Sequence, residues 1–533
     1  IFFKPLISPF KALPISPISS ALSFTGLSGN SPTLIFIRIF FSVFIGSLIF
    51  KLLISGLIPI TGDEALFYVW SQDLSWGYYD HPPMIAWMLA PLSWISSELV
   101  VIRLPASILN HLVALGIINL VIHWQPEKKN SAYKVGIIYL LLPSSILSVL
   151  VTNDSALFLF MALASYFFIR GEIEEKKGID SKSKYATMIY VACGASLGMA
   201  FLSKYLAIFI AVSFFVILVY QRKYFNLLVI SITSACFLLI NFFWNINNCW
   251  QNIVFNTVNR TDDLVSPLVG VPSYLLILFY LITPWLLWYL YQSRKTLKNN
   301  ASIALLAFIP FVLFGILSFK QLIGLHWLPA YLPALLLLFC LSATEKQLNR
   351  AQIYTFGFGF IHAIIICIAI FAPSATWKDM KFYEKLSTLK NSSDIAKSVD
   401  PINDDKRTLM SMGYSTSSIF AFHLHKEVPV FGTGSKFGRH DDLHFNFKEI
   451  NGKNIRIFNN SPMNLEELSR FFGSSNLVEF TFKGVKYWYL DGNDFKYDLY
   501  RKLVLIAIKE KFYNIPAYLP SYTCNFFTKY DLQ

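Results

Sequence analysis

The chain has 533 residues, of which 55% are hydrophobic and 17% aromatic, while only 14% are charged and the mean hydropathy is positive. Soluble globular domains do not combine these values, so the composition excludes an ordinary soluble protein and predicts a chain that crosses a membrane many times. The net charge of +13 does not indicate nucleic-acid binding, because Lys and Arg lie largely in short loops between apolar runs, where they set membrane orientation. We therefore expect no nucleic-acid partner.

Residues 1–33 are rich in Pro and Ser and are expected to be an N-terminal extension, either cytoplasmic or a non-native start. A membrane-spanning helix needs about 20 mostly apolar residues, and eleven such runs follow. They lie near 34–58, 100–122, 134–151, 154–170, 186–202, 205–220, 225–244, 271–291, 301–319, 325–342 and 353–373. The stretch 84–97 is apolar but short and contains a proline, so we expect an interfacial or re-entrant helix there.

The distribution of basic residues predicts how these helices are oriented. The loops expected on one side of the membrane carry fifteen Lys and Arg, whereas those on the other side carry three. Since cytoplasmic loops are enriched in Lys and Arg, we expect the N-terminus in the cytoplasm. Asp63, Asp154, Lys204, His326 and the tail after residue 373 then lie together on the outer face.

The hydropathy falls after residue 373, which predicts a transmembrane domain at 34–373 and a soluble α/β domain at 374–533. Within this tail, the pattern of 409–432 predicts a strand, a helix and a strand, and that of 465–473 a short helix stopped by glycine. A hairpin is expected to turn at Lys483-Gly484. The six cysteines show no CxxC or metal-ligand spacing and are interpreted as small hydrophobic residues.

Asp63 and Glu64 are the first acidic residues of the chain and open a segment with helical periodicity. Leu66 and Trp70 lie on one face, expected toward lipid, and Tyr68 lies on the polar face, expected toward a cavity. Adjacent helical residues point about 100° apart, so the two carboxylates cannot serve the same proton. One of them suits a general base; the alternative is that both only cap the helix.

Further polar residues are expected at the same membrane face. Asp154 is either a second acid of a site or a helix cap. Lys204 follows a span on the lysine-poor side, which suggests a bound anion, most simply a phosphate; the alternative is snorkelling toward the membrane surface. His326 begins another span, and His81 lies in a stiff turn before two prolines; either fits the cavity or is structural.

Other features carry weaker signals. Arg103 and Arg260 are interpreted as ligand contacts or as lipid-headgroup or loop contacts. The glycine-rich segment 432–438 lacks the spacing of a dinucleotide site and is interpreted as a turn. No metal site is predicted, because the tail histidines lack supporting Cys or acidic spacing; they are His423, His425, His440 and His444.

Six short motifs follow one another along residues 34 to 445. They are Gly62-Asp63-Glu64-Ala65, the turn from Trp76 to Pro83, Thr152-Asn153-Asp154, Leu202-Ser203-Lys204-Tyr205, His326-Trp327 with Pro329, and Gly438-Arg439-His440-Asp441-Asp442. In this order they resemble the bacterial glycosyltransferase family 39/83 group, the relatives of protein O-mannosyltransferases and of the aminoarabinose and galacturonic acid transferases of lipopolysaccharide. The resemblance implies a GT-C fold, which is a bundle of membrane helices, here about eleven with interfacial helices, followed by a soluble periplasmic α/β domain.

The resemblance also implies an activity, the inverting transfer of a sugar from a polyprenyl-phosphate donor at the periplasmic face of the bacterial inner membrane. Asp63 matches the catalytic base, Asp154 the second acid, Lys204 a ligand of the donor phosphate, and Glu64 an acceptor-side or orienting group. The remaining candidates complete the predicted site, with His81, His326 and Arg260 on the donor side and Tyr68, Tyr79 and Asp80 in the cavity and acceptor region.

The acceptor predicted first is lipid A or the lipopolysaccharide core, because a lipid acceptor fits the interfacial aromatic residues and surrounding membrane lipids. Protein O-glycosylation is the alternative. A lipid-linked sugar carrier or flippase is less favoured, since the candidate polar residues gather on one side only. The chemistry requires no cofactor, and no metal is predicted, although carboxylates near a phosphate can recruit a divalent ion.

Overall fold

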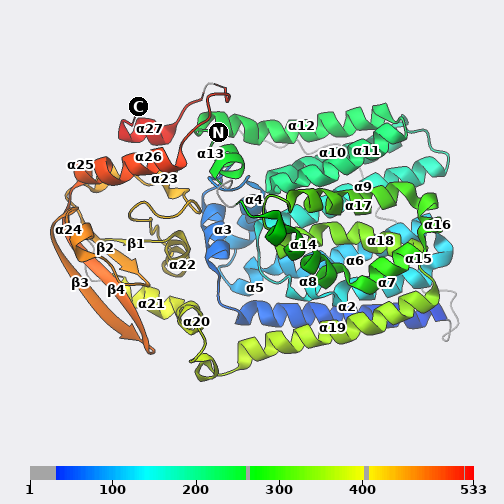
Figure 1. The fold of residues 1–533 in the computed structure, drawn as a ribbon, viewed down its shortest axis with the longest axis horizontal. Helices are drawn as coiled ribbons and strands as arrows, with labels where there is room; N and C mark the ends of the chain where they lie inside the picture. Colours follow the sequence, from blue (N-terminus) through cyan, green and yellow to red (C-terminus); the bar gives the residue numbers. More distant parts are fainter. Residues whose placement is uncertain (1–31, 260–263, 401–406, 521, 533) are drawn as a thin grey trace.

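The computed structural model describes residues 32–532 apart from 260–263, 401–406 and 521. Long helices run side by side along one axis, and a smaller α/β part covers one end of them (Figure 1). The helices of the bundle and its loops are α2 (Pro32–Leu57), α3 (Gly62–Gln72), α4 (Met84–Ser93), α5 (Leu99–Ile102), α6 (Leu104–Trp124), α7 (Lys129–Leu141), α8 (Pro143–Leu147), α9 (Asn153–Lys176), α10 (Lys184–Ser203), α11 (Ile208–Tyr220), α12 (Tyr224–Asn247), α13 (Gln251–Val254), α14 (Pro267–Ile282), α15 (Pro284–Gln292), α16 (Arg294–Leu297), α17 (Ala301–Leu317), α18 (Leu332–Ser342) and α19 (Glu345–Phe371).

Among the described residues, eight helices are long and apolar enough to span a membrane, or nine if the bent pair α14 and α15 is one span. The predicted number of eleven is therefore not confirmed, and three predicted runs differ. The run 134–151 breaks at Pro143, because the residue before a proline is driven out of the helical conformation. The run 205–220 holds only the short α11, and 271–291 bends by 78° where Pro284 interrupts the hydrogen-bond ladder.

The loops of the bundle divide between its two ends as the basic residues predicted. At one end Lys128 donates to the carbonyl of Leu341, and Gln221 donates to Ser302. At the other end lie α3, α4 and the α/β part (Figure 1). α4 is ten residues long, too short to span, as expected for 84–97.

The tail forms a four-stranded sheet with the order β1-β2-β4-β3, in which β1 and β2 are parallel and the other pairs antiparallel. The predicted hairpin is present, with its turn at Lys483 and Gly484, both at positive φ. The second strand predicted within 409–432 is only an isolated bridge at Val430. The tail elements are α20 (Tyr383–Lys390), α21 (Ser392–Val399), β1 (Arg407–Ser411), α22 (Tyr414–Leu424), α23 (Asp441–His444), β2 (Asn454–Asn459), α24 (Leu465–Ser469), β3 (Phe472–Phe482), β4 (Val485–Phe495), α25 (Tyr497–Tyr500), α26 (Ile506–Phe512) and α27 (Asn525–Tyr530).

Helix α22 of the tail packs directly on α3, and the two share one buried apolar cluster. A Cβ atom at Gly62 would lie 1.8 Å from Ser415 Oγ, so only glycine permits this approach. Trp70 is buried and stacks on Tyr78 with ring centroids 4.3 Å apart. The expectation that this face of α3 meets lipid is therefore wrong, because protein covers both faces of the helix.

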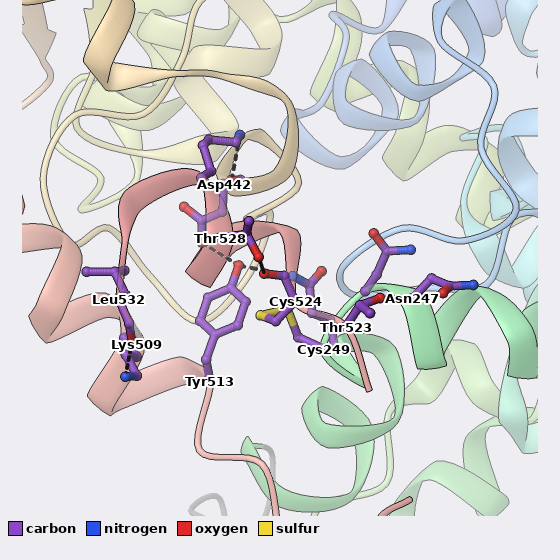
Figure 2. The surroundings of a disulfide bond; sticks show 12 residues. Asn247, Cys249, Asp442, Lys509, Tyr513, Thr523, Cys524, Thr528 and Leu532 are labelled. Carbon is purple, nitrogen blue, oxygen red and sulfur yellow. Dashed lines mark hydrogen bonds between the residues drawn. A yellow bond between two sulfur atoms is a disulfide. The ribbon is translucent and has the colours of Figure 1, made fainter. Parts of the chain in front are cut away.

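A disulfide joins Cys249, just after α12, to Cys524 at the start of α27 (Figure 2). The interpretation of all six cysteines as small hydrophobic residues is wrong for this pair. The backbone reinforces the junction, since Cys249 N–H donates to Thr523 and Thr523 N–H donates to Ile246. The C-terminal segment is thereby fastened to the helix bundle at the end that carries α3.

Candidate functional site

The N-terminus of α3 separates its two acidic residues. Thr61 and Glu64 form a capping box, in which each side chain meets the other residue's backbone N–H. This geometry points the Glu64 side chain toward the protein interior and leaves Asp63 exposed on the outside of the first turn. The two carboxylates therefore point in different directions, as expected for adjacent residues of a helix, while their separate roles stay a prediction.

Glu64 lies in a buried ion pair with Arg103. The Nε and Nη2 atoms of Arg103 donate to the two carboxylate oxygens at 2.8 and 2.6 Å, and the backbone N–H of Val151 donates to the same carboxylate at 3.0 Å. Arg103 also donates to the carbonyls of Ser55 and Ile58. Through these bonds the ion pair joins α2, α3, α6 and the segment before α9. Neither side chain is exposed, so Arg103 does not contact lipid headgroups.

Asp63 receives its hydrogen bond from the tail. The hydroxyl of Tyr414, the first residue of α22, donates to Asp63 Oδ1 at 3.1 Å. Burial raises the pKa of the Tyr414 hydroxyl, and the neighbouring negative charge of Asp63 raises it further. Tyr414 thus stays a proton donor, and the outer edge of the carboxylate faces solvent.

Asp154 and Lys204 form a largely buried ion pair at the same end of the bundle. Asp154 lies in the first turn of α9, capped by Thr152, and Lys204 ends α10. Lys204 Nζ donates to Asp154 Oδ1 at 2.7 Å, while His326 Nε2 lies 3.8 Å from Asp154 Oδ2. The ammonium also lies 5.6 Å from the ring centre of Trp327. The structure therefore brings together three residues predicted from separate motifs.

The turn around His81 is tied to the same helix start. Asn153 Nδ2, next to Asp154, lies 3.2 Å from His81 Nδ1. The turn is closed by a hydrogen bond from Tyr78 N–H to the His81 carbonyl. His81 thus contacts the first turn of α9, the helix that carries Asp154, and its place on the donor side stays a prediction.

Tyr79 and Asp80 point away from this cluster and under the tail. Tyr79 is fully buried, accepts from Asn259 at 3.3 Å, and has a pKa raised by burial. Asp80 Oδ2 accepts from the backbone N–H of Gly438 at 2.7 Å. Since the Tyr79 ring also packs against Tyr513, both residues contact the tail, which differs from their predicted place in the cavity. Arg260, predicted on the donor side, lies outside the described residues.

Two cavities lie near these residues. One, which we call the α3–tail cavity, has a volume of about 560 Å³ and is lined by residues of α3, including Tyr68, and by α22 and the segment 425–430. The other is an apolar cavity of about 130 Å³ between α6, α9 and α18. Tyr331 lines the apolar cavity, and its hydroxyl donates to the carbonyl of Leu206.

Reasoning from sequence missed Tyr414 and did not identify the partner of Arg103. Arg103 carries a signal, because a single charge inside an apolar run indicates a buried partner. Tyr414 carries none, since its partner lies 351 positions away. Within the described part of the chain, no group of three His, Cys, Asp or Glu residues is arranged to hold a metal ion.

Parts of the chain are similar to known proteins. The family model described as dolichyl-phosphate-mannose-protein mannosyltransferase matches residues 80–245. The lipid A galacturonosyltransferase RgtD of Rhizobium johnstonii is 28% identical over 212 residues, which are 38% of this chain and 41% of RgtD. The chain therefore matches less than half the length of this relative, and the resemblance predicted from the motifs is confirmed.

Solved structures share the fold. Those of ArnT from Cupriavidus metallidurans, in the apo state and bound to undecaprenyl phosphate, superpose with TM-scores of 0.56 and 0.58. Each likeness covers 86% of this chain and 97% of ArnT at 13% sequence identity. The predicted GT-C fold is confirmed at the level of an ArnT-like arrangement of helices.

Proposed function

We propose that this chain is an inverting glycosyltransferase that moves a sugar from a polyprenyl phosphate to an acceptor on lipid A or lipopolysaccharide. The observation that carries the proposal is the Lys204–Asp154 pair beside His326, at the same end of the bundle as the exposed Asp63. A cation held by one carboxylate suits a donor phosphate, and a second, solvent-facing carboxylate suits a general base.

The donor phosphate binds Lys204, which remains oriented by Asp154. A lipid phosphate is already a stable leaving group, so its departure needs charge stabilisation more than protonation. The apolar cavity near Tyr331 suits the first part of the lipid chain. His81 and His326 flank this donor side, and the ArnT structure with undecaprenyl phosphate supports a lipid of this class.

Asp63 takes the acceptor proton on the other side of the reacting carbon. The acceptor oxygen forms a bond to the anomeric carbon as the bond from that carbon to the phosphate oxygen breaks, with inversion. The proton passes to the Asp63 carboxylate, and the lipid phosphate leaves with the electron pair. Glu64 contributes by fixing the start of α3 through Arg103.

The site and the tail lie on the periplasmic side in this proposal. Two independent features support that orientation. Lys and Arg are enriched in the loops at the opposite end of the bundle, and disulfides such as Cys249–Cys524 persist in the oxidising periplasm.

Mass spectrometry of lipid A and core oligosaccharide tests the proposal. Cells with the wild-type protein are compared with a deletion strain, an Asp63→Asn strain and a matched Asp180→Asn strain, in which an exposed acid outside the site is changed. We expect one sugar mass to be lost in the deletion and in Asp63→Asn and kept in Asp180→Asn. Unchanged glycolipids would refute a lipopolysaccharide acceptor, and a changed glycoprotein would then favour the protein acceptor named by the matching family model.

A further inference from the structure

Tyr414 links the α3–tail cavity to Asp63, the proposed base. Tyr414 lines the cavity, and its hydroxyl donates to Asp63. The cavity has a volume of about 560 Å³, which falls in the range of small-ligand sites. Tyr414 therefore contacts both the cavity and the Asp63 carboxylate.

The charges of this cavity are unsuited to a phosphate. Its lining includes the carboxyl groups of Asp73, Glu427 and Asp441. Among the described lining residues, Lys426 is the only Lys or Arg, and its ammonium is bound to Asp400. An anionic group placed here would meet the carboxylates of Asp73 and Glu427, while Asp441, whose pKa is raised to about 7 by burial, adds only a partial charge at neutral pH.

Two of the three lining histidines, His440 and His444, have a lowered pKa, which favours their neutral form. Burial lowers the pKa of His440, and the neighbouring His444 lowers it further. The pKa of His444 is itself lowered by burial, against an opposing effect of Asp73. His440 is 9% exposed, and neither of its ring nitrogens has a hydrogen-bond partner among the described residues.

The remaining lining groups suit a sugar. Tyr68, Trp70 and Tyr414 provide aromatic surface, while Gln72 and Ser418 provide neutral donors and acceptors. Aromatic and apolar walls with a few placed polar groups are typical of small-molecule sites. Carboxylates and neutral imidazoles accept hydrogen bonds from hydroxyl or ammonium groups.

We infer that the α3–tail cavity binds the acceptor as an uncharged or amino-substituted sugar, and that the new bond is formed to a sugar hydroxyl rather than to a phosphate. The inference rests on the proposed function and narrows its acceptor. It also explains the need for Asp63, because a hydroxyl must lose a proton as it attacks, whereas a phosphate oxygen is already ionised at neutral pH.

Ligand binding to the purified full-length protein tests the cavity without turnover. Saturation-transfer NMR with methyl glucosaminide and with glucosamine 1-phosphate compares the two chemistries directly. Ala421 lines the cavity, so Ala421→Trp fills it, whereas Thr416→Trp places the same bulk elsewhere on α22. We expect methyl glucosaminide to bind better than the phosphate ester. Its affinity should fall about tenfold in Ala421→Trp, and it should be unchanged in Thr416→Trp. Preferential binding of the phosphate ester, or equal binding by Ala421→Trp and wild type, would overturn the inference.

The linkage of the product separates this inference from the proposed function. Tandem mass spectrometry and phosphorus NMR of the modified glycolipid locate the added sugar. A sugar on a hydroxyl, lost in Ala421→Trp, supports the inference. A sugar on a phosphate overturns it while leaving the transferase proposal intact. If no strain contains a product, the transferase proposal fails, and the binding measurement alone decides whether the cavity takes a sugar.

Discussion

Tyr414 in the tail donates its hydroxyl hydrogen to Asp63 in α3, with 3.1 Å between the two oxygens and 351 positions between the residues. Close packing around Tyr414 fixes this contact. Gly62 packs against Ser415, and a Cβ at Gly438 would lie 2.3 Å from the Tyr414 ring. The tail is therefore part of the proposed site rather than an appendage to a membrane enzyme.

Removal of this hydrogen bond is expected to slow the reaction without unfolding the protein. In Tyr414→Phe the ring still fills its place, but the carboxylate loses the donor that orients it. Since hydrogen bonds to charged groups contribute about 1.5–3 kcal/mol, kcat should fall by at least about tenfold, with KM for the lipid donor unchanged. Tyr497→Phe is the matched control, because that buried hydroxyl has no partner among the described residues. Equal kcat values for the two variants would remove Tyr414 from its positioning role.

Glu64→Gln is expected to destabilise the protein. The change leaves Arg103 buried opposite a neutral amide, and breaking a buried ion pair typically costs about 3–5 kcal/mol. We expect a lower thermal unfolding midpoint and a lower yield of folded protein, while the molecules that remain folded keep most of their turnover. A variant with normal thermal stability and no turnover would instead give Glu64 the direct role at the acceptor that its motif predicts.

Loss of the Lys204 ammonium is expected to weaken donor binding. KM for the polyprenyl-phosphate donor should rise by about tenfold or more in Lys204→Ala, because a charge-assisted contact to phosphate is removed. Lys204→Arg should recover part of this loss, since it retains the charge. Lys320→Ala provides the control, as this exposed lysine precedes the loop that leads to His326. A donor KM unaffected by Lys204→Ala would exclude the phosphate contact.

The disulfide gives a direct test of which side of the membrane the tail occupies. In protein taken from cells without reduction, a maleimide reagent under denaturing conditions should label only Cys193, Cys236, Cys340 and Cys367. Reduction should add Cys249 and Cys524. Labelling of all six before reduction would contradict an oxidising location. The double change to serine is expected to destabilise the protein by about 2–5 kcal/mol, whereas Cys236→Ser should have little effect.

Stability should decrease between about pH 4 and pH 7 because of Asp441. Burial raises the pKa of this carboxyl from 3.8 to about 7, and the charge of Asp442 adds to the effect. The folded protein therefore holds this proton over a range in which the unfolded chain has released it, so the stabilisation is complete below pH 4 and lost above pH 7. In Asp441→Asn the thermal unfolding midpoint should vary less with pH across this range than in the exposed Asp498→Asn control. An unchanged slope would show that the carboxyl ionises normally.

The sequence by itself determined the properties that depend on local composition. Apolar runs predict membrane helices because lipid offers no hydrogen-bond partners to backbone N–H and C=O groups. The counts of Lys and Arg predict which loops lie at the same end of the bundle. Helical periodicity likewise predicted a helix that opens at Asp63 and Glu64, and turn residues predicted the hairpin at Lys483-Gly484, since both depend on neighbouring residues. The order of short motifs was sufficient for the glycosyltransferase resemblance.

Only the tertiary structure decided which side chains meet. Periodicity placed Asp63 and Glu64 on different faces, but the packing of α6 and α22 determined that one faces Arg103 and the other Tyr414. The pairing of Cys249 with Cys524 and the burial of Trp70 have the same origin. These contacts join residues far apart in the chain, and their energies depend on burial and on the partner, which no local pattern records.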